Sequence, residues 1–206
     1  LLDLTTNALV ALYFACHEKK HHRTNGELII LDIPNDQIKY FDSDTVAILS
    51  AISVQPIDFE ITKSIKTAET QEKLKKSDYI LKQYESIQSF DEIRTRIQQD
   101  YNIDMPDGNE YLRLIGSVAR EEGEEAFKKS FNEQKEIVKL IHDVRADKPS
   151  FCPEIECSDL ERVLCVRAKL NNARISRQQG CFLLYGLDKN KLQPAKVPEE
   201  WQQKID

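Results

Sequence analysis

Blocks of apolar and polar residues along the chain predict sheet-forming segments at both ends with helices between them. Residues 1–16 start with Leu-Leu-Asp-Leu, turn polar at Thr5, Thr6 and Asn7, and then run apolar from Ala8. This order predicts a strand end, a corner and a helix, because side-chain oxygens at a corner can cap the following helix. The apolar residues on either side are of core type, so we expect both the strand and the helix to be buried.

Two more segments near the start of the chain have strand or helix character. Residues 27–33 are apolar between charged ends and are followed by Pro34, which predicts a strand buried on both faces. Strand, helix and strand at this spacing could form a crossover unit, but the pairing stays open. Residues 45–52 follow a polar group at 42–44 that can cap a helix, so a short helix is expected there.

The middle of the chain, residues 58–144, has the pattern of amphipathic helices. Charged residues dominate, Gly and Pro are scarce, and apolar residues recur at helical spacing. A turn is predicted at 106–109, where the sequence is Pro-Asp-Gly-Asn. The apolar stripes consist of Ile80, Leu81, Tyr84, Ile87, Ile93, Ile97, Tyr101, Leu112, Ile115, Val118, Ala119, Phe127, Phe131, Ile137, Leu140 and Ile141.

The end of the chain returns to strand patterning. A Pro-containing loop at 151–155 precedes two apolar segments, 160–167 and 180–186, whose residues favour β-strands. Trp201 is expected to dock the tail of the chain. These patterns predict an α+β domain with a small mixed sheet from the two ends and a helical block between them. The expected parts are an N-terminal sheet and helix part, a helical block, and a C-terminal sheet part with its tail, over residues 1–57, 58–145 and 146–206.

Composition narrows the classes of function. The net charge is −6 over 206 residues, which argues against a chain-wide surface for nucleic acid or anionic membrane. No apolar run is long enough to cross a bilayer, so no membrane partner is expected. Five cysteines, an odd number among mostly apolar neighbours, indicate reduced and buried thiols in a cytoplasmic protein.

Several motifs of enzymes are missing from the sequence. It contains no Gly-x-Ser-x-Gly elbow, no phosphate-binding Gly-x-x-x-x-Gly-Lys loop and no Gly-x-Gly-x-x-Gly. His17 and His21 are spaced like a metal pair, but their charged neighbours favour a solvated loop, and no metal site is predicted. Asp42 and Asp44 fit a helix cap better than a cation site.

Residues 171–180 gather Asn, Arg, Ser and Gln side chains immediately before a predicted strand. Such groups can hold a ribose, an amide or a phosphate. They can equally satisfy the backbone at a sheet edge, and composition leaves the two interpretations open. The polar corner near the start of the chain has the same two interpretations, a helix cap or part of a binding site.

Residues 1–15 and 172–186 resemble the FRG domain, a prokaryotic family named for an aromatic–Arg–Gly motif, and residues 40–45 and 144–149 add weaker similarity. The chain contains no aromatic–Arg–Gly, and we expect that motif to precede Leu1. The family has mostly been a presumed domain, often met near mobile elements and phage-defence genes. The resemblance therefore implies a role in phage defence or as a toxin.

The order of elements in the family is also similar to that of ADP-ribosyltransferases, and this similarity implies a pocket for NAD or a related nucleotide. The residues implied in ligand binding are Thr5, Thr6, Asn7, Arg174, Gln178 and Gln179. The two threonines would orient the nicotinamide ribose, and one of the two glutamines would bond a ribose hydroxyl. No Glu stands where the catalytic acid belongs, and a neutral amide cannot stabilise an oxocarbenium ion as a carboxylate does. The alternative is a non-enzymatic module that binds a protein or nucleic acid through the helical block.

Overall fold

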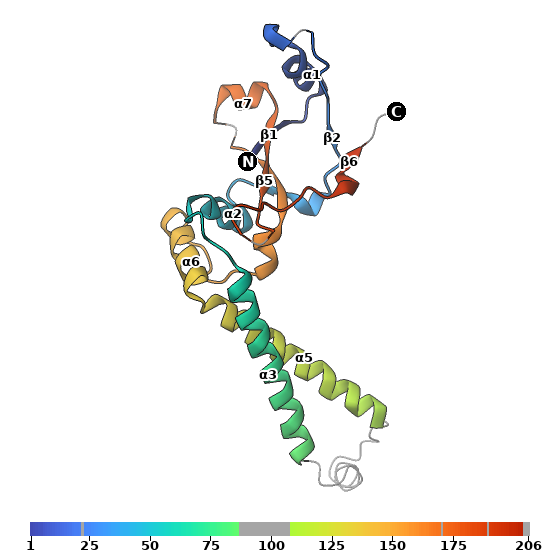
Figure 1. Ribbon diagram of the computed structural model, residues 1–206, viewed down its shortest axis with the longest axis vertical. Coiled ribbons are helices and arrows are strands. Elements are labelled where there is room, and N and C mark those ends of the chain that lie inside the picture. Colours follow the sequence, from blue (N-terminus) through green and yellow to red (C-terminus); the bar gives the residue numbers. More distant parts are fainter. Residues whose placement is uncertain (22, 87–107, 170, 189, 204–206) are drawn as a thin grey trace. The chain divides into compact units, whose positions relative to one another are not determined.

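The computed structural model describes residues 1–21, 23–86, 108–169, 171–188 and 190–203. The chain divides into two compact units, one formed by Leu1–Ile61 with Val138–Asp206 and the other by Thr62–Ile137. The first unit holds both sheets, and the second holds a pair of long helices (Figure 1). The fold is α+β, as the sequence predicts.

Strands from both ends of the chain build the main sheet, in the order β1-β5-β4-β3. β1 pairs antiparallel with β5, β5 pairs antiparallel with β4, and β4 pairs parallel with β3. A second sheet pairs β2 with β6 in antiparallel fashion. The strands are β1 (Leu2–Thr5), β2 (Ile30–Leu31), β3 (Ile38–Tyr40), β4 (Val163–Arg167), β5 (Gly180–Tyr185) and β6 (Gln202–Gln203). The prediction of a small mixed sheet from the two ends is confirmed.

Within its described residues the first unit also contains four α-helices, two of which begin at a polar cap that the sequence indicates. Asn7 caps α1 by accepting bonds from the Leu9 and Val10 amides, and Ser43 caps α2 by accepting from the Val46 amide. These oxygens satisfy amides that have no partner within the helix. The helices are α1 (Ala8–Cys16), α2 (Asp44–Val54), α6 (Lys135–Asp147), which begins at the end of the second unit, and α7 (Ala173–Arg177).

One face of the sheet carries a hydrophobic cluster that fixes the tail of the chain. Val163 and Leu183 lie in this cluster with Ala195 and Trp201, and Leu4 packs against it. Trp201 is only 4% exposed, and its carbonyl accepts a bond of 2.7 Å from the Asp32 amide. The expected docking of the tail by its single tryptophan is confirmed.

The second unit is a pair of helices, α3 (Thr62–Ser86) and α5 (Gly108–Asn132). Ile115, Ala119 and Phe131 of the predicted stripes are buried here. The predicted turn at 106–109 differs from the structure, because Gly108 and Asn109 already belong to α5. Residues 87–107, which include part of the predicted stripes, lie outside the described residues.

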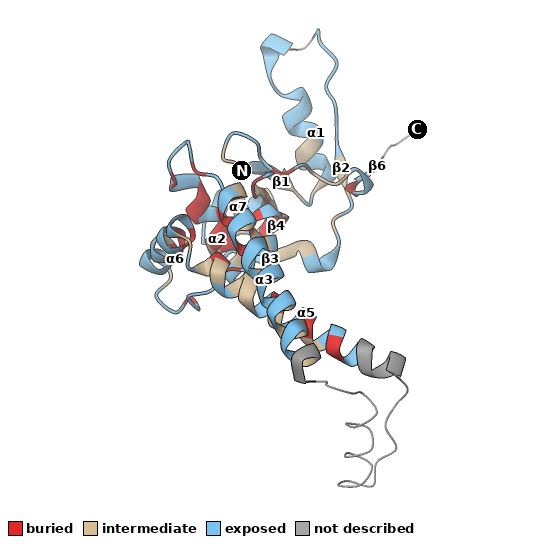
Figure 2. Ribbon diagram, turned by 60° about the horizontal axis from the view of Figure 1, so that its bottom comes forward, coloured by how far each residue is buried: buried red, intermediate tan, exposed pale blue. Residues whose placement is uncertain are grey.

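The structure differs most from the sequence-based expectation at α1. An entirely apolar helix predicts burial on every side, but α1 has no buried residue, and Leu9 is 76% exposed. Figure 2 shows the contrast with α2, which buries one face and has five buried residues. The expected strand at 27–33 is reduced to the two residues of β2, and Ile29 beside it is exposed. Apolarity therefore predicted the element at 8–16 correctly and its burial incorrectly.

The cysteines differ in how far they are buried. Cys165 and Cys181 are buried in the sheet, as predicted, whereas Cys157 is half-buried and Cys16 and Cys152 are exposed. None of the five cysteines, all within the described residues, forms a disulfide. Among the helices that the structure describes, none is long and apolar enough to cross a membrane.

Candidate functional site

A pocket of about 560 Å³ lies where the β1 corner, α1 and the turn between α7 and β5 meet. It brings together residues that are far apart in the sequence, since β1 and β5 are neighbouring strands. Three of the six predicted ligand-binding residues, Thr5, Arg174 and Gln178, line it. Thr6 lines an adjacent pocket, and Asn7 and Gln179 line neither of the two.

The hydroxyl of Thr5 is engaged with the backbone. It donates a bond of 2.6 Å to the Gln178 carbonyl and accepts one of 3.1 Å from the Asn7 amide. Its only proton is therefore already used. In the structure Thr5 joins the corner before α1 to the turn before β5, and this positions the wall of the pocket.

Thr6 and Gln179 make a second contact between the corner before α1 and the turn before β5, one residue further along each segment. The Thr6 amide donates to the Gln179 carbonyl at 3.1 Å, and the Thr6 hydroxyl lies 3.4 Å from the same oxygen. Gln179 has a φ of 48°, in the left-handed region that residues other than Gly rarely adopt. The contact with the corner is therefore made by the Gln179 backbone carbonyl, and the Gln179 side chain is exposed.

Arg174 in the short helix α7 and Gln178, the residue directly after that helix, both line the pocket. Asn172 caps this helix by accepting a bond of 2.9 Å from the Arg174 amide. The Arg174 side chain donates from Nε to Oε1 of Gln178 over 3.4 Å. In the described part of the chain no carboxylate lies within ion-pair distance of Arg174, so its guanidinium keeps most of its donors for a ligand.

Asp3 and Phe14 are among the lining residues of this pocket that sequence reasoning missed. Side chains two apart in a strand share a face, so the position of Asp3 beside Thr5 could have been inferred. Phe14 lies one helical turn after Val10, which also lines the pocket, but nothing in the sequence marks either residue as part of a pocket. With these two, the pocket contains a carboxylate and an aromatic wall in addition to its amides and guanidinium.

The chemistry of the pocket is that of recognition. A guanidinium can bind a phosphate or carboxylate through two parallel bonds. Phe14 and Phe182 line the apolar part, and ring faces of this kind stack against flat heterocycles. Asp3 can accept bonds from hydroxyl groups. Together they suit a ligand that has an anionic group, hydroxyls and a flat apolar part.

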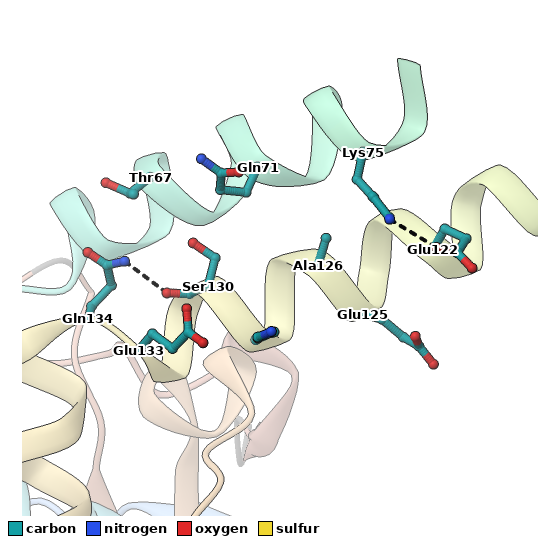
Figure 3. A pocket seen from close by; sticks show the side chains of 10 residues that line it. Thr67, Gln71, Lys75, Glu122, Glu125, Ala126, Ser130, Glu133 and Gln134 are labelled. Carbon is teal, nitrogen blue, oxygen red and sulfur yellow. Dashed lines mark hydrogen bonds and ion pairs between the residues drawn. The ribbon is translucent and has the colours of Figure 1, made fainter. Parts of the chain in front are cut away.

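The second unit has a pocket of its own, of about 620 Å³, which lies on its helical pair (Figure 3). Lys75 of α3 pairs with Glu122 of α5 at 3.6 Å, and Gln134 donates to the Ser130 carbonyl at 2.8 Å. The lining of this pocket thus carries both positive and negative charges, and some of its polar groups bond one another instead of facing a ligand. We therefore place the candidate site in the first pocket.

Two histidines near α1, His17 and His21, have local partners. The ring of His17 stacks on Tyr13 with 5.0 Å between centroids, and His21 lies 3.6 Å from a Glu18 carboxylate oxygen. The described residues contain no group of three His, Cys, Asp or Glu side chains placed to hold a metal ion.

In comparisons with known proteins, no protein family, curated protein or solved structure matches the chain. The function is therefore argued from the pocket itself.

Proposed function

We propose that this chain is a cytoplasmic FRG-domain protein of phage defence or toxin type, whose first-unit pocket binds NAD or a related nucleotide. The observation that carries the proposal is the placement of Arg174 in a pocket that is also lined by Phe14 and Phe182. A guanidinium beside aromatic side chains matches the two ends of a nucleotide, its phosphates and its base.

The size and polarity of the pocket support a small-molecule ligand. Ligand pockets commonly measure about 300–1,000 Å³ and combine apolar walls with a few polar groups, and this pocket of about 560 Å³ falls within that range. In the proposal Arg174 binds the phosphates, and the Gln178 amide, oriented by its bond to Arg174, donates to a ribose hydroxyl. Asp3 accepts from another hydroxyl.

Thr5, Thr6, Asn7 and Gln179 have a different place in this proposal from the one that the family resemblance implies. Thr5, Thr6 and the Gln179 backbone connect the corner before α1 with the turn before β5, and the Asn7 amide bonds Thr5 within the corner. They therefore position the pocket, and direct contact with the ligand comes from Arg174, Gln178 and Asp3.

A thermal-shift screen of the full chain against NAD, NADP, ADP-ribose and short nucleic acids tests the proposal. A ligand that binds the native state raises the melting temperature by mass action. We expect a rise with NAD or ADP-ribose that is lost in Arg174→Gln and kept in Arg177→Gln. Arg177 is the matched control, because it lies on α7 but does not line the pocket. No nucleotide effect in the wild-type chain would refute the nucleotide pocket.

A second candidate function, a non-enzymatic binding module for a protein partner, is favoured by the surface of α1. Leu9 is 76% and Leu12 is 53% exposed on a helix without charged residues. Clustered exposed apolar residues are typical of protein-binding surfaces. A chain that ignores nucleotides, and whose pull-down partner is lost in Leu9→Ser with Leu12→Ser, would support this function instead.

A further inference from the structure

Two buried cysteines lie on neighbouring strands of the main sheet. Cys165 on β4 lies opposite Leu183 of β5, and Cys181 on β5 lies opposite Arg167 of β4. Opposed residues of an antiparallel pair share a face, and so do residues two apart on one strand. Cys165 and Cys181 are therefore diagonal neighbours on the same face of the sheet.

The two thiols also share a pocket of about 440 Å³, next to the proposed nucleotide pocket. Thr5, Thr6 and Asp32 supply polar groups to its lining. Each cysteine is 7% exposed, so its sulfur is shielded from bulk solvent but borders a space that admits small molecules. This placement distinguishes the pair from Cys16 and Cys152, which lie on the surface.

The environment favours a thiolate at Cys165. A hydrogen bond from Cys181 and the positive charge of Arg167 lower the pKa of Cys165 to about 7, although burial acts in the opposite direction. The same hydrogen bond, together with burial, raises the pKa of Cys181. Once the pair has lost one proton, the remaining proton stays on Cys181 and bonds the Cys165 thiolate. Cys165 is therefore the better nucleophile of the two.

We propose that Cys165 is a site of oxidation by hydrogen peroxide, and that Cys181 resolves the oxidised residue by forming a disulfide with it. The thiols are diagonal neighbours on one sheet face and line the same pocket, which gives the oxidant access and places the second sulfur beside the first. The inference is independent of nucleotide binding.

The reaction balances in two steps. The Cys165 thiolate attacks one peroxide oxygen, the O–O bond breaks, and a sulfenic acid and hydroxide form. The Cys181 thiol then attacks the sulfenic sulfur, an S–S bond forms, the S–O bond breaks, and water leaves with the thiol proton. The dithiol loses two electrons, and peroxide gains them.

The position of the pair also predicts how stable the disulfide is. Diagonal neighbours in a sheet have Cα atoms about 7–8 Å apart, whereas disulfides usually need less than about 7 Å. The excess separation runs along the strand direction, so β4 and β5 must shift along each other or distort locally to close the bond. We expect mild reductants to reverse the oxidation, and we expect the oxidised protein to melt at a lower temperature.

Peptide mapping by mass spectrometry after treatment of the full-length chain with hydrogen peroxide tests the proposal. The expected product is a Cys165–Cys181 disulfide that dithiothreitol removes. In Cys181→Ser the sulfenic acid has no resolving thiol, so dimedone should label Cys165 there at least several-fold more than in the wild-type chain.

Cys152→Ser is the control variant and should leave the disulfide yield unchanged. Oxidation confined to Cys16 and Cys152, or a Cys165 that stays reduced in the folded wild-type chain, would overturn the proposal. The peptide map of the wild-type chain distinguishes these outcomes by itself, so the test does not depend on the folding of a variant.

Discussion

The hydroxyl of Thr5 donates a hydrogen bond of 2.6 Å to the backbone carbonyl of Gln178, 173 residues further along the chain. The bond connects the corner that starts α1 with the turn that starts β5, and Figure 1 shows these two segments side by side. Both segments line the candidate pocket. The geometry of the pocket therefore depends on a contact between the two ends of the chain.

Thr5→Val should destabilise the protein, because the Gln178 carbonyl and the Asn7 amide both lose their partner. We expect a loss of about 1–3 kcal/mol in the free energy of unfolding. Urea titration monitored by the fluorescence of Trp201, the single tryptophan, measures it. Thr5→Ser keeps the hydroxyl and should lose much less. Thr6→Val, with an exposed contact of 3.4 Å, should change stability by about 0.5 kcal/mol or less. Equal losses at both positions would contradict this role of Thr5.

Gly186→Ala should be strongly destabilising. An added Cβ would collide with the Leu160 carbonyl oxygen and lie 2.8 Å from that of Arg162, and backbone cannot move aside as a side chain can. We expect a loss of about 3 kcal/mol. Gly116→Ala is the opposite case, since nothing lies within 4 Å and the position is an exposed helix interior. It should gain about 0.5–1 kcal/mol. Thermal melts of the two variants should move in opposite directions.

Gln179→Gly should stabilise the protein or leave it unchanged, even though it removes a side chain next to the site. The φ of 48° costs a residue with a side chain about 1–2 kcal/mol, and the greater entropy of unfolded Gly offsets about half of this gain. Gln179→Val should destabilise the protein, because a branched Cβ tolerates this φ poorly. If Gln179→Gly instead caused a large loss in a urea titration, the side chain would have a structural role that its exposed position does not reveal.

The alkylation rate of Cys165 should depend on pH with a midpoint near 7. The hydrogen bond from Cys181 lowers the pKa of Cys165 to about 7, so the reactive thiolate predominates above that pH and is lost below it. Iodoacetamide labelling followed by mass spectrometry of the Cys165 peptide gives the profile. Cys181→Ala removes the donor and should move the midpoint upward, towards the ordinary value of about 8.5. An unchanged midpoint in that variant would contradict the thiol–thiol hydrogen bond.

The sequence predicts the strands β1, β4 and β5 and the starts of the helices α1 and α2, because their signals are local, whereas the three-residue strand β3 was not expected. The apolar segment at 180–186 and the polar caps at Asn7 and Ser43 each determine an element from a few neighbouring residues. The docking of Trp201 was predictable as well, since a lone large aromatic in a polar tail gains most by burial.

The sequence predicted that the two ends of the chain share a sheet, but it could not predict which side chains of the two ends contact each other. Burial of α1 depends on which segments cover it, and an apolar pattern carries no information about that. The proton of the Thr5 hydroxyl is used by a carbonyl 173 residues away, so its availability to a ligand depends on tertiary structure alone. For the same reason the sequence indicated Arg174 and Gln178 as donors but left their common pocket with Phe14 undetected.

Calorimetric titration of ADP-ribose into the wild-type chain, Arg174→Gln and Arg177→Gln tests the central claim most directly. Both variants remove one positive charge from α7, but only Arg174 lines the pocket. The proposal predicts binding in the wild type and in Arg177→Gln, and an affinity at least about 10-fold weaker in Arg174→Gln, as expected from loss of a charge-assisted hydrogen bond. Equal affinity in all three proteins, or no heat of binding in the wild type, would contradict a nucleotide site at this pocket.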